Sequence, residues 1–399
     1  MKVRNIKALV PFKGYVVRSL TFEKVGAQIN LEFDKRSGPR CPRCNQRLAR
    51  NKVARRVVYD NPMPHGALTM ITFPTAQALC KKCNHYVTSC PREVHPTCKA
   101  TYRFMRQISA WASVATADDV AAMFEISPSS VRRYDKIILK ETTPEPDLDN
   151  LKCLLIDEKS PGKKRPFVTV IINGETGELL HMAEGKKRES VESFYEKLTE
   201  AQKSKIRVVG MDRSGAYQAA TEAHLPNAEI VYDRFHLVMN VNQAVDEVRR
   251  SQWREAPRED KHVMKGKRYL VLKNPENLDQ DGRRRLDELL AANVKLSTAY
   301  VLKEQFRSLF HYQKIGWAKR ALKGWCDMAV SSGLAPFRRL AKTFGSQTDR
   351  VCGFVKHRLT SGRIEGFNNL MSRIIHRACG IRDMDYLELR LRHHTIMRS

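Results

Sequence analysis

The 399-residue sequence lacks any long apolar run. No stretch approaches the roughly 18–20 apolar residues that a membrane-spanning helix needs. The opening MKVRNIKALVPFKGYVVRSL also lacks the apolar segment and small-residue cleavage site of a secretory signal. Internal repeats and low-complexity tracts are absent as well. We therefore expect a cytoplasmic protein with no membrane partner.

Acidic residues are scarce relative to basic ones. Lys and Arg number 71 against 43 Asp and Glu, which gives a formal net charge of +28. Such an excess costs self-repulsion unless a polyanion offsets it. Nucleic acid is the leading candidate, because contacts from Lys and Arg to phosphates drive most non-specific binding. With 42% hydrophobic and 29% charged residues, the chain has the composition of folded domains and not of a disordered protein.

Cysteines occur in two matched pairs, within CPRC at 41–44 and CKKC at 80–83. Cysteines stay reduced in the cytoplasm, where such pairs indicate metal more often than disulfides. Two C-x-x-C turns suit one tetrahedral zinc ion, and four unrelated buried cysteines are the less favoured alternative. The expected zinc ligands are Cys41, Cys44, Cys80 and Cys83.

Three basic residues lie inside these cysteine turns, so this small domain presents positive charge that is suited to DNA. They are Arg43, Lys81 and Lys82. Four further residues follow at looser spacing, and we expect them to be structural or solvated and not a second metal site. They are His85, Cys90, His95 and Cys98.

A pair of short helices joined by a tight turn is predicted within 116–140. The expected apolar contacts between them are Val120, Ala121, Phe124, Ile126 and Val131. The second helix then turns short polar and basic side chains outward, as a recognition helix does in the major groove. These side chains are Ser129, Ser130, Arg132 and Arg133. An ordinary pair of helices with a solvated face is the alternative.

The Pro- and acid-rich stretch 142–150 is predicted to be a linker. Beyond it, the pattern predicts strand, strand, strand, helix, strand, helix, strand. The expected strands are 151–157, 165–173, 177–185, 206–212 and 228–233, with helices at 189–204 and 216–226. Residues from 236 to about 350 have only helical texture, and a further helix at 361–380 has Ser361 as its candidate N-cap and Gly380 near its end.

Two acids end apolar strands, Asp157 in LLIDEKS and Asp212 in VVGMDRSGAY. An acid at a strand end is usually just the point where the chain reaches solvent. If these two strands are parallel neighbours, however, both acids lie at the carboxyl edge where ligands bind in open sheets. This order of elements resembles the ribonuclease H fold, in which such acids hold divalent metal. Glu365, one turn into the last helix, is the best third ligand, although an acid there also interacts with the helix dipole.

Glu365 shares its side of the helix with three polar residues at i+3, i+4 and i+7. They are Asn368, Asn369 and Ser372. Tyr217 lies close to Asp212 along the chain, and we interpret it as a packing residue and not as a nucleophile.

Four blocks resemble those of bacterial insertion-sequence transposases of the DDE type, and most of all the ISL3 family. They are LLIDEKS, VVGMDRSGAYQAA, EIVYDRFHLVMNV and TSGRIEGFNNLMSRIIHRACGIRDMDYLELRLR. The resemblance implies that Asp157, Asp212 and Glu365 are the catalytic triad. Asp233 and His236, in YDRFH, are similar to a family block beside the active site and are ranked as accessory.

The resemblance implies a multidomain α/β protein in which an all-α insertion interrupts a ribonuclease H-like core. The expected parts are a zinc ribbon at 1–100, a helix–turn–helix at 101–141, a linker at 142–150, core at 151–235, the insertion at 236–350 and the rest of the core at 351–399. It also implies a bacterial, nucleoid-associated protein that binds double-stranded DNA, namely its terminal inverted repeats and its target, and that works as a homodimer or larger assembly.

Carboxylate oxygens suit Mg²⁺ or Mn²⁺, and two such ions support in-line displacement at phosphorus. We therefore expect DNA cleavage and strand transfer, with one structural Zn²⁺ upstream. A metal-dependent nuclease without strand transfer is one alternative, and a DNA-binding regulator with an inactive core is another. The insertion is either a DNA-contacting platform or a solvated bundle, and its best-defined basic run is Arg283, Arg284 and Arg285.

Overall fold

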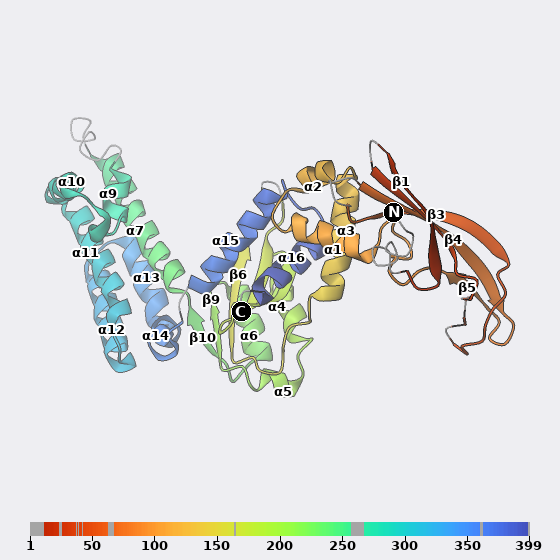
Figure 1. Cartoon of the computed structure of the whole chain (residues 1–399). Coiled ribbons are helices and arrows are strands. Elements are labelled where there is room, and N and C mark those ends of the chain that lie inside the picture. Colours follow the sequence, from red (N-terminus) through yellow and green to blue (C-terminus); the bar gives the residue numbers. More distant parts are fainter. Residues whose placement is uncertain are drawn as a thin grey trace. The chain divides into compact units, whose positions relative to one another are not determined.

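In a computed structural model, which Figure 1 shows, the chain forms two compact units. The first unit contains 1–144 and 375–393, and the second contains 145–374 and 394–399. The structure describes residues 12–23, 26–36, 38, 40–41, 43–62, 68–162, 165–256, 267–359 and 362–397.

The first unit opens with a five-stranded sheet in the order β1-β2-β4-β3, with β5 paired to β4. Only β2 and β4 run parallel, and the remaining pairs are antiparallel. Ile71 and Phe73 alternate with more exposed neighbours along β4 and are fully buried, as expected for a strand with one face on a core. The strands are β1 (Tyr15–Glu23), β2 (Gly26–Phe33), β3 (Lys52–Asp60), β4 (Leu68–Cys80) and β5 (His85–Ser89).

Three helices follow the sheet, and the predicted pair at 116–140 is present. Thr116 and Asp119 form a reciprocal cap at the start of the middle helix, and Ser127 with Pro128 starts the next one. The predicted contact residues are buried, except Ile126, which is half-buried. The helices are α1 (Tyr102–Ala112), α2 (Ala117–Met123) and α3 (Pro128–Thr142).

The second unit contains a five-stranded sheet in the order β10-β9-β6-β7-β8. The three strands β10, β9 and β6 run parallel, whereas β7 is antiparallel to both β6 and β8. The predicted strands are all present, in the predicted order along the chain. They are β6 (Cys153–Lys159), β7 (Val168–Asn173), β8 (Leu179–Glu184), β9 (Val208–Met211) and β10 (Glu229–Tyr232).

The prediction of a single helix at 189–204 is wrong. The chain forms α4 (Arg188–Tyr195) and then a separate α5 (Glu200–Lys203). The reason is a capping box, in which Thr199 and Gln202 satisfy each other's backbone amides and so start a new helix. The predicted helix at 216–226 is present as α6 (Gly215–His224).

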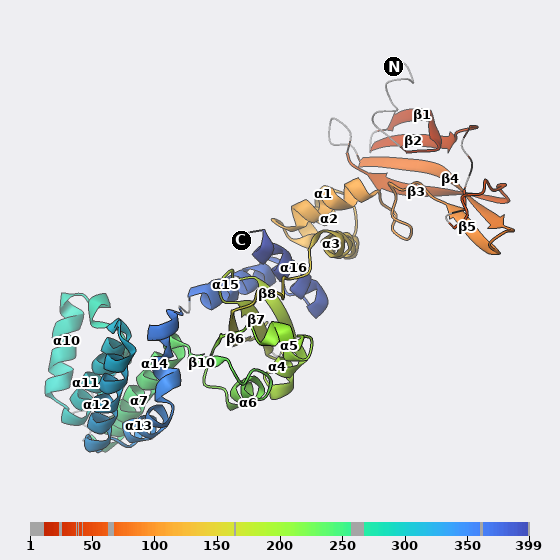
Figure 2. The ribbon, with the colours of Figure 1, turned by 90° about the horizontal axis from the view of Figure 1, so that it is seen from below.

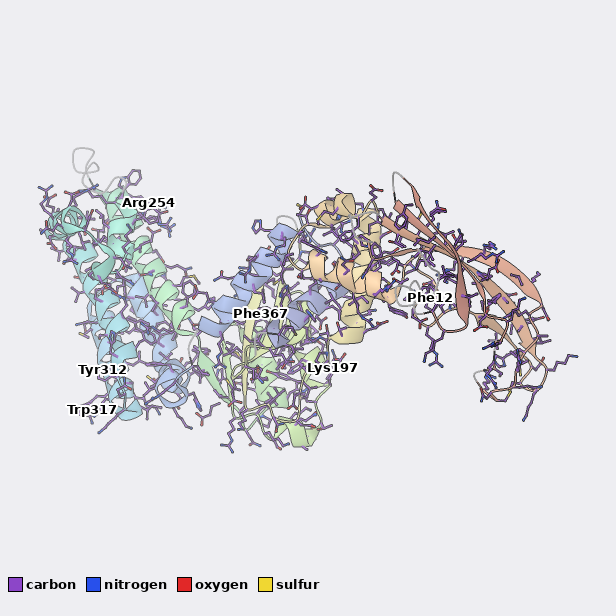
Figure 3. The ribbon with its side chains drawn as sticks, viewed as in Figure 1. Phe12, Lys197, Arg254, Tyr312, Trp317 and Phe367 are labelled. Atoms are coloured by element: carbon purple, nitrogen blue, oxygen red, sulfur yellow. The ribbon has the colours of Figure 1, made fainter. Side chains whose placement is uncertain are left out.

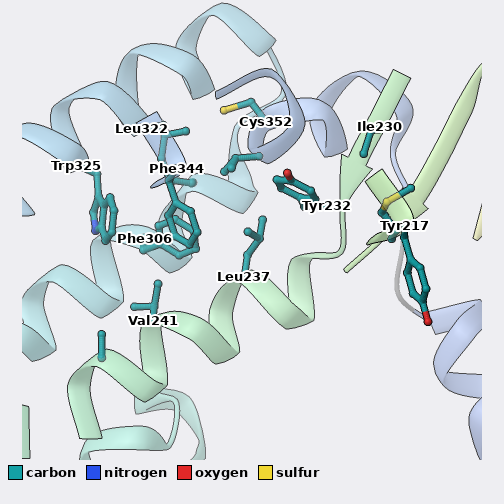
Figure 4. Packing of buried hydrophobic residues seen from close by; sticks show 14 of the residues in the cluster. Tyr217, Ile230, Tyr232, Leu237, Val241, Phe306, Leu322, Trp325, Phe344 and Cys352 are labelled. Atoms are coloured by element: carbon teal, nitrogen blue, oxygen red, sulfur yellow. The ribbon is translucent and has the colours of Figure 1, made fainter. Parts of the chain in front are cut away.

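A helical insertion follows β10, and its core is continuous with the core of the sheet (Figure 4). Phe306, Trp325 and Phe344 form its aromatic centre, with ring centroids 5.0 Å apart for Phe306–Trp325 and 5.2 Å for Phe306–Phe344. Leu237 and Tyr232 extend the same cluster back to the sheet. The helices are α7 (Arg234–Glu255), α9 (Arg268–Leu272), α10 (Gln280–Ala291), α11 (Val294–Ser308), α12 (Ile315–Ser331), α13 (Ala335–Ser346) and α14 (Thr348–His357).

The last two helices are α15 (Gly362–Arg377) and α16 (Met384–Ile396). Gly380 follows α15 with a φ of 95°, a backbone conformation that favours glycine, whereas the expected N-cap Ser361 lies outside the described residues. Although we expected 351–399 to belong to the core, residues 375–393 are compact with the first unit. Within the ranges that the structure describes, no helix combines the length and apolar character that crossing a membrane requires.

Candidate active site, metal centre and DNA-contact residues

The carboxyl ends of three neighbouring parallel strands each carry an acid. Register pairs Leu155 of β6 with Gly210 of β9, and Tyr232 of β10 with Met211 of β9. The same offsets align Asp157 with Asp212, and Asp212 with Asp233. Adjacent strands lie about 4.8 Å apart, so the two predicted acids are neighbours, and Asp233 forms a third member of the row.

Helix α15 lies beside this part of the sheet (Figures 1 and 2). Its apolar positions recur at helical spacing and are buried, among them Phe367, which Figure 3 labels. The same helix places the Nδ2 of Asn368 2.7 Å from Asp157 Oδ2, to which it donates a hydrogen bond. Glu365 lies one turn earlier and is exposed. The helix thus contacts the strand that carries the first acid at a point one turn after the predicted third acid.

The carboxyl groups influence one another electrostatically. Burial raises the pKa of Asp212 above its ordinary value, and the charge of Asp157 adds to this rise. Burial also raises the pKa of Asp233, with further contributions from Asp157 and Glu365. His236 opposes both shifts, and its Nε2 lies 3.9 Å from Asp157 Oδ1. The acids therefore form one coupled group, in which a cation would relieve the repulsion.

The donor set at this edge fits a hard divalent cation. Carboxylate oxygens are the ligands that Mg²⁺ and Mn²⁺ prefer. Asn368 Oδ1 is buried and has no hydrogen-bond partner among the described residues, which leaves an acceptor for a water molecule beside the acids. In the described part of the chain, the cysteine cluster described below gathers its ligand atoms within 4.8 Å of one another, and the three acids do not form such a group.

Two neighbours of the acids have structural contacts of their own. Asp233 starts α7, where its Oδ1 accepts a hydrogen bond from the Phe235 amide at 2.8 Å. Tyr217 is fully buried, its hydroxyl lies 2.8 Å from Thr169 Oγ1, and burial raises its pKa to about 12. These contacts fit the expectation that Tyr217 packs and does not attack phosphorus.

The four predicted cysteine ligands come together in the first unit. Their sulfur atoms all lie within 4.8 Å of one another, and the Sγ atoms of Cys44 and Cys80 are 3.6 Å apart. A tetrahedral zinc site with Zn–S bonds of about 2.3 Å needs sulfurs about 3.8 Å apart, so the cluster fits such an ion. Each pair is followed by an Asn with positive φ, Asn45 at 59° and Asn84 at 47°, which closes a tight turn.

The looser cysteines and histidines have other contacts. Cys90 accepts a hydrogen bond from Arg56, and Cys98 is buried in the core of the helices. His95 Nδ1 accepts from the amides of Thr97 and Cys98 at 3.2 and 3.1 Å. His85 stands apart, because its Nε2 lies 3.9 Å from Cys41 Sγ, beside the cysteine cluster.

The residues predicted to contact DNA from α3 lie on its solvent side. Ser129, Arg132 and Arg133 are exposed and Ser130 is half-exposed. Arg133 also donates a hydrogen bond to Thr97 Oγ1 at 3.2 Å. In the cysteine turns, Arg43, Lys81 and Lys82 extend from the surface with no more than partial burial.

The basic run of the insertion is partly neutralised. Arg283, Arg284 and Arg285 are all exposed on α10. Two of them pair with Asp281, at 2.8 Å for Arg284 and 3.6 Å for Arg285. Asp281 lies at i−3 from Arg284 and at i−4 from Arg285, the spacing of helical ion pairs, so this neutralisation has a signal in the sequence.

Tryptophans of the insertion divide between two environments. Trp325 is buried, and its Nε1 donates to Leu302 O at 2.8 Å. Trp317, at the start of α12 (Figure 3), is 54% exposed and lies under the guanidinium of Arg320. Trp325 is thus a core residue, whereas Trp317 remains available at the surface.

One buried polar group escaped the sequence analysis. Asp135 is 1% exposed, although it lies on the apolar face of α3 beside Tyr134 and Ile138. It contacts Ser109, Tyr386 and Arg390, all within the first unit. The signal was present in RRYDKIILK, because an acid on an apolar stripe needs a buried partner.

Acids aligned on neighbouring strands, with a further acid on an adjoining helix, form a set of carboxylates suited to a divalent cation and to chemistry on phosphate esters. Residues 154–391 match the family model of ISL3-type DDE transposases, whose description is "Transposase". The chain therefore belongs to the ISL3 family of DDE transposases, and it is a transposase of an insertion sequence whose substrate is DNA.

Curated relatives agree with this assignment. The chain is 33% identical over 297 residues to the transposase for insertion sequence element IS1001 of Bordetella parapertussis, a match that covers 74% of this chain and 73% of the relative. It is 26% identical over 307 residues to the transposase for insertion sequence element IS1557 of Mycobacterium tuberculosis, covering 71% and 69% of the two chains.

Proposed function

We propose that this transposase cuts and joins DNA at a site formed by Asp157, Asp212 and Glu365, which would hold two Mg²⁺ or Mn²⁺ ions. The alignment of the acids across the carboxyl ends of β6 and β9, with α15 bound to Asp157 through Asn368, carries the proposal. Bound there, two divalent ions would activate the attacking oxygen and stabilise the leaving one.

The chain's own residues prepare this site. Asn368 holds one oxygen of Asp157, and the amide of Ser214 holds Asp212 Oδ1 at 3.0 Å. These bonds fix the direction in which each carboxylate points. Asp233 and His236 are accessory groups. Asp233 adds negative charge beside the triad, and His236 offsets part of it.

The wider architecture supports the same function. We propose that β6 to β10 with α15 form a ribonuclease H-like core, interrupted by the helical insertion, and that the cysteine cluster is a zinc ribbon with one Zn²⁺ per chain. We further propose that α2 and α3 are a helix–turn–helix that binds terminal inverted repeats. Because transposition brings two ends together, a homodimer or larger assembly on DNA is part of the proposal.

The catalytic proposal is tested with DNA duplexes that carry the element's terminal repeat. Asp157→Asn, Asp212→Asn and Glu365→Gln should each abolish Mg²⁺-dependent cleavage and strand transfer and leave duplex binding intact. Glu158→Gln is the matched control, because Glu158 is the next acid along β6 and should tolerate the change. Full cleavage by any of the three variants would remove that residue from the triad.

Two further measurements separate the alternatives. Joined products formed from a cleaved end and a second duplex identify strand transfer, whereas cleavage without joining would favour a nuclease. Elemental analysis should find one zinc per folded chain, and Cys44→Ser or Cys83→Ser should lower that content. A zinc-free folded protein would contradict the zinc proposal without affecting the catalytic one.

A further inference from the structure

The segment 375–393, which carries the end of α15 and most of α16, is packed into the first unit. Three exposed or partly exposed contacts hold it there. Lys136 of α3 pairs with Asp383 at 2.6 Å, Arg377 donates to the backbone oxygen of Ser113, and Thr143 Oγ1 lies 3.2 Å from His393 Nδ1. The segment thus contacts the proposed recognition helix in its middle and at its C-terminal end, and also the C-terminal end of its neighbour α1.

A buried network fixes this packing. Arg390 Nε donates to Asp135 Oδ2 at 2.9 Å, and its Nη2 donates to Ala112 O at 2.6 Å. Tyr386 also donates to Asp135, and Ser109 of α1 donates to the other oxygen at 2.6 Å. These partners offset the free-energy cost of removing the Asp135 carboxylate from water. The network therefore holds residues 382 and 383 in one place beside α3.

A cavity of about 400 Å³ lies between α3 and this segment. Arg132, Arg382 and Arg390 line it, together with Asp383. Arg390 is committed to Asp135, and Asp383 to Lys136. Arg132 and Arg382 are both exposed, and neither has an acidic partner within the described ranges. Two uncompensated guanidinium groups thus face one hollow beside the proposed recognition helix.

We propose that this cavity binds the DNA backbone, with Arg382 contributing a phosphate contact next to that of Arg132. The proposal rests on the proposed function of α3 and adds a DNA-contacting residue from the far end of the chain. Guanidinium groups suit phosphate oxygens because they donate two parallel hydrogen bonds. DNA is the occupant that the charge favours, because neither cation pairs with an acid among the residues that the structure describes.

The test measures the salt dependence of binding by the full chain to an end-repeat duplex and to a random duplex. Arg382→Gln should make the negative slope of log K against log salt shallower by about 0.9 on both duplexes, as expected for one lost phosphate contact. At 0.1 M salt this corresponds to roughly eightfold weaker binding. Arg36→Gln is the matched control, because it removes one charge from an exposed turn of the same unit, away from the cavity.

Arg382 is exposed, so Arg382→Gln should keep the parent's thermal midpoint. A slope equal to the parent's, or a decrease no larger than that of Arg36→Gln, would overturn the phosphate contact. Because the slope is read on random DNA as well, this outcome is independent of end recognition. A parent protein that shows no preference for the end repeat would instead count against the proposed function of α3.

Discussion

Asn368 joins the helix that carries Glu365 to the strand that carries Asp157. Its amide donates to Asp157 Oδ2, and groups that orient a metal-ligating carboxylate typically affect metal affinity or activity by about 10–100-fold. We expect Asn368→Ala to lower cleavage by about that factor at limiting Mg²⁺, and less at saturating Mg²⁺. Cleavage rates across a Mg²⁺ titration measure the effect.

Asn369→Ala is the control for this change. Asn369 is the next residue on α15 and is exposed, so Asn369→Ala removes the same type of amide but leaves the hydrogen bond from Asn368 to Asp157 in place. If both variants show the same Mg²⁺ dependence as the parent, Asn368 does not position Asp157.

Asp212 gives a prediction about stability and pH. Burial raises its pKa above the ordinary 3.8, so its charge destabilises the folded state at any pH above the raised value. This cost disappears as the pH falls through the folded pKa toward 3.8. In EDTA at pH 7, Asp212→Asn should therefore have a higher thermal midpoint than the parent, and the difference should shrink on acidification. Mg²⁺ should raise the parent's midpoint and leave the variant's unchanged.

The control is Asp147, whose pKa is shifted in the opposite direction to that of Asp212. Hydrogen bonds from the Asn150 side chain and the Asp149 amide lower the pKa of Asp147, so its ionised form favours folding at neutral pH. Asp147→Asn should not raise the midpoint. An Asp212→Asn protein less stable than the parent in EDTA would contradict the prediction, since the hydrogen bond to Ser214 would then outweigh burial.

At the scale of whole elements, the sequence predicted what depends on local pattern. Apolar runs ending in Asp157 and Asp212 identified two strands, and the spacing around Glu365 identified a helix. Strand register, which aligns the first two acids with Asp233, depends on hydrogen bonds between distant segments and has no local signature. The break before Thr199 was missed because apolar periodicity continues across it.

The packing of α16 on α3 allows buried and exposed ion pairs to be compared on adjacent residues. Asp135 and Arg390 have side chains only 2% and 9% exposed, whereas those of Lys136 and Asp383 are 25% and 49% exposed. Removing one partner of a buried pair typically costs about 3–5 kcal/mol, and an exposed pair contributes about 0–1 kcal/mol. We expect Asp135→Ala to destabilise the protein strongly and Lys136→Ala to change its stability little.

Urea unfolding, followed by a probe in the first unit such as Trp111, measures both variants. Equal effects at the two positions would mean that the Asp135 network does not anchor 375–393. In that case the position of Arg382 beside α3 would lose its physical basis.

Across the whole molecule, a net charge of +28 makes DNA binding strongly dependent on salt. Neutralising Arg283, Arg284 and Arg285 to Gln should reduce the magnitude of the negative slope of log K against log salt if α10 contacts DNA. Three free cations would contribute about 2.7, but Asp281 pairs with two of them, so we expect a decrease nearer to 0.9. The fold should be unaffected, because all three side chains are exposed.

Asp281→Asn provides the matched control in the opposite direction. It frees Arg284 and Arg285 and should steepen the slope if the helix lies near phosphates. Parent-like slopes for both proteins would mean that the basic run is a solvated face of a helical bundle.

The contact of 375–393 with α1 and α3 also determines when the first unit matures during protein synthesis. Asp135 is made 251 residues before Tyr386 and 255 before Arg390. At about 5–20 residues per second, this delay amounts to roughly 13–50 s. Throughout it, α3 exists without the partners of its buried carboxylate, and the ribosome has already produced all three acids of the triad before those partners emerge. The unit that carries the proposed recognition helix, although encoded first, is therefore among the last parts of the protein to be completed.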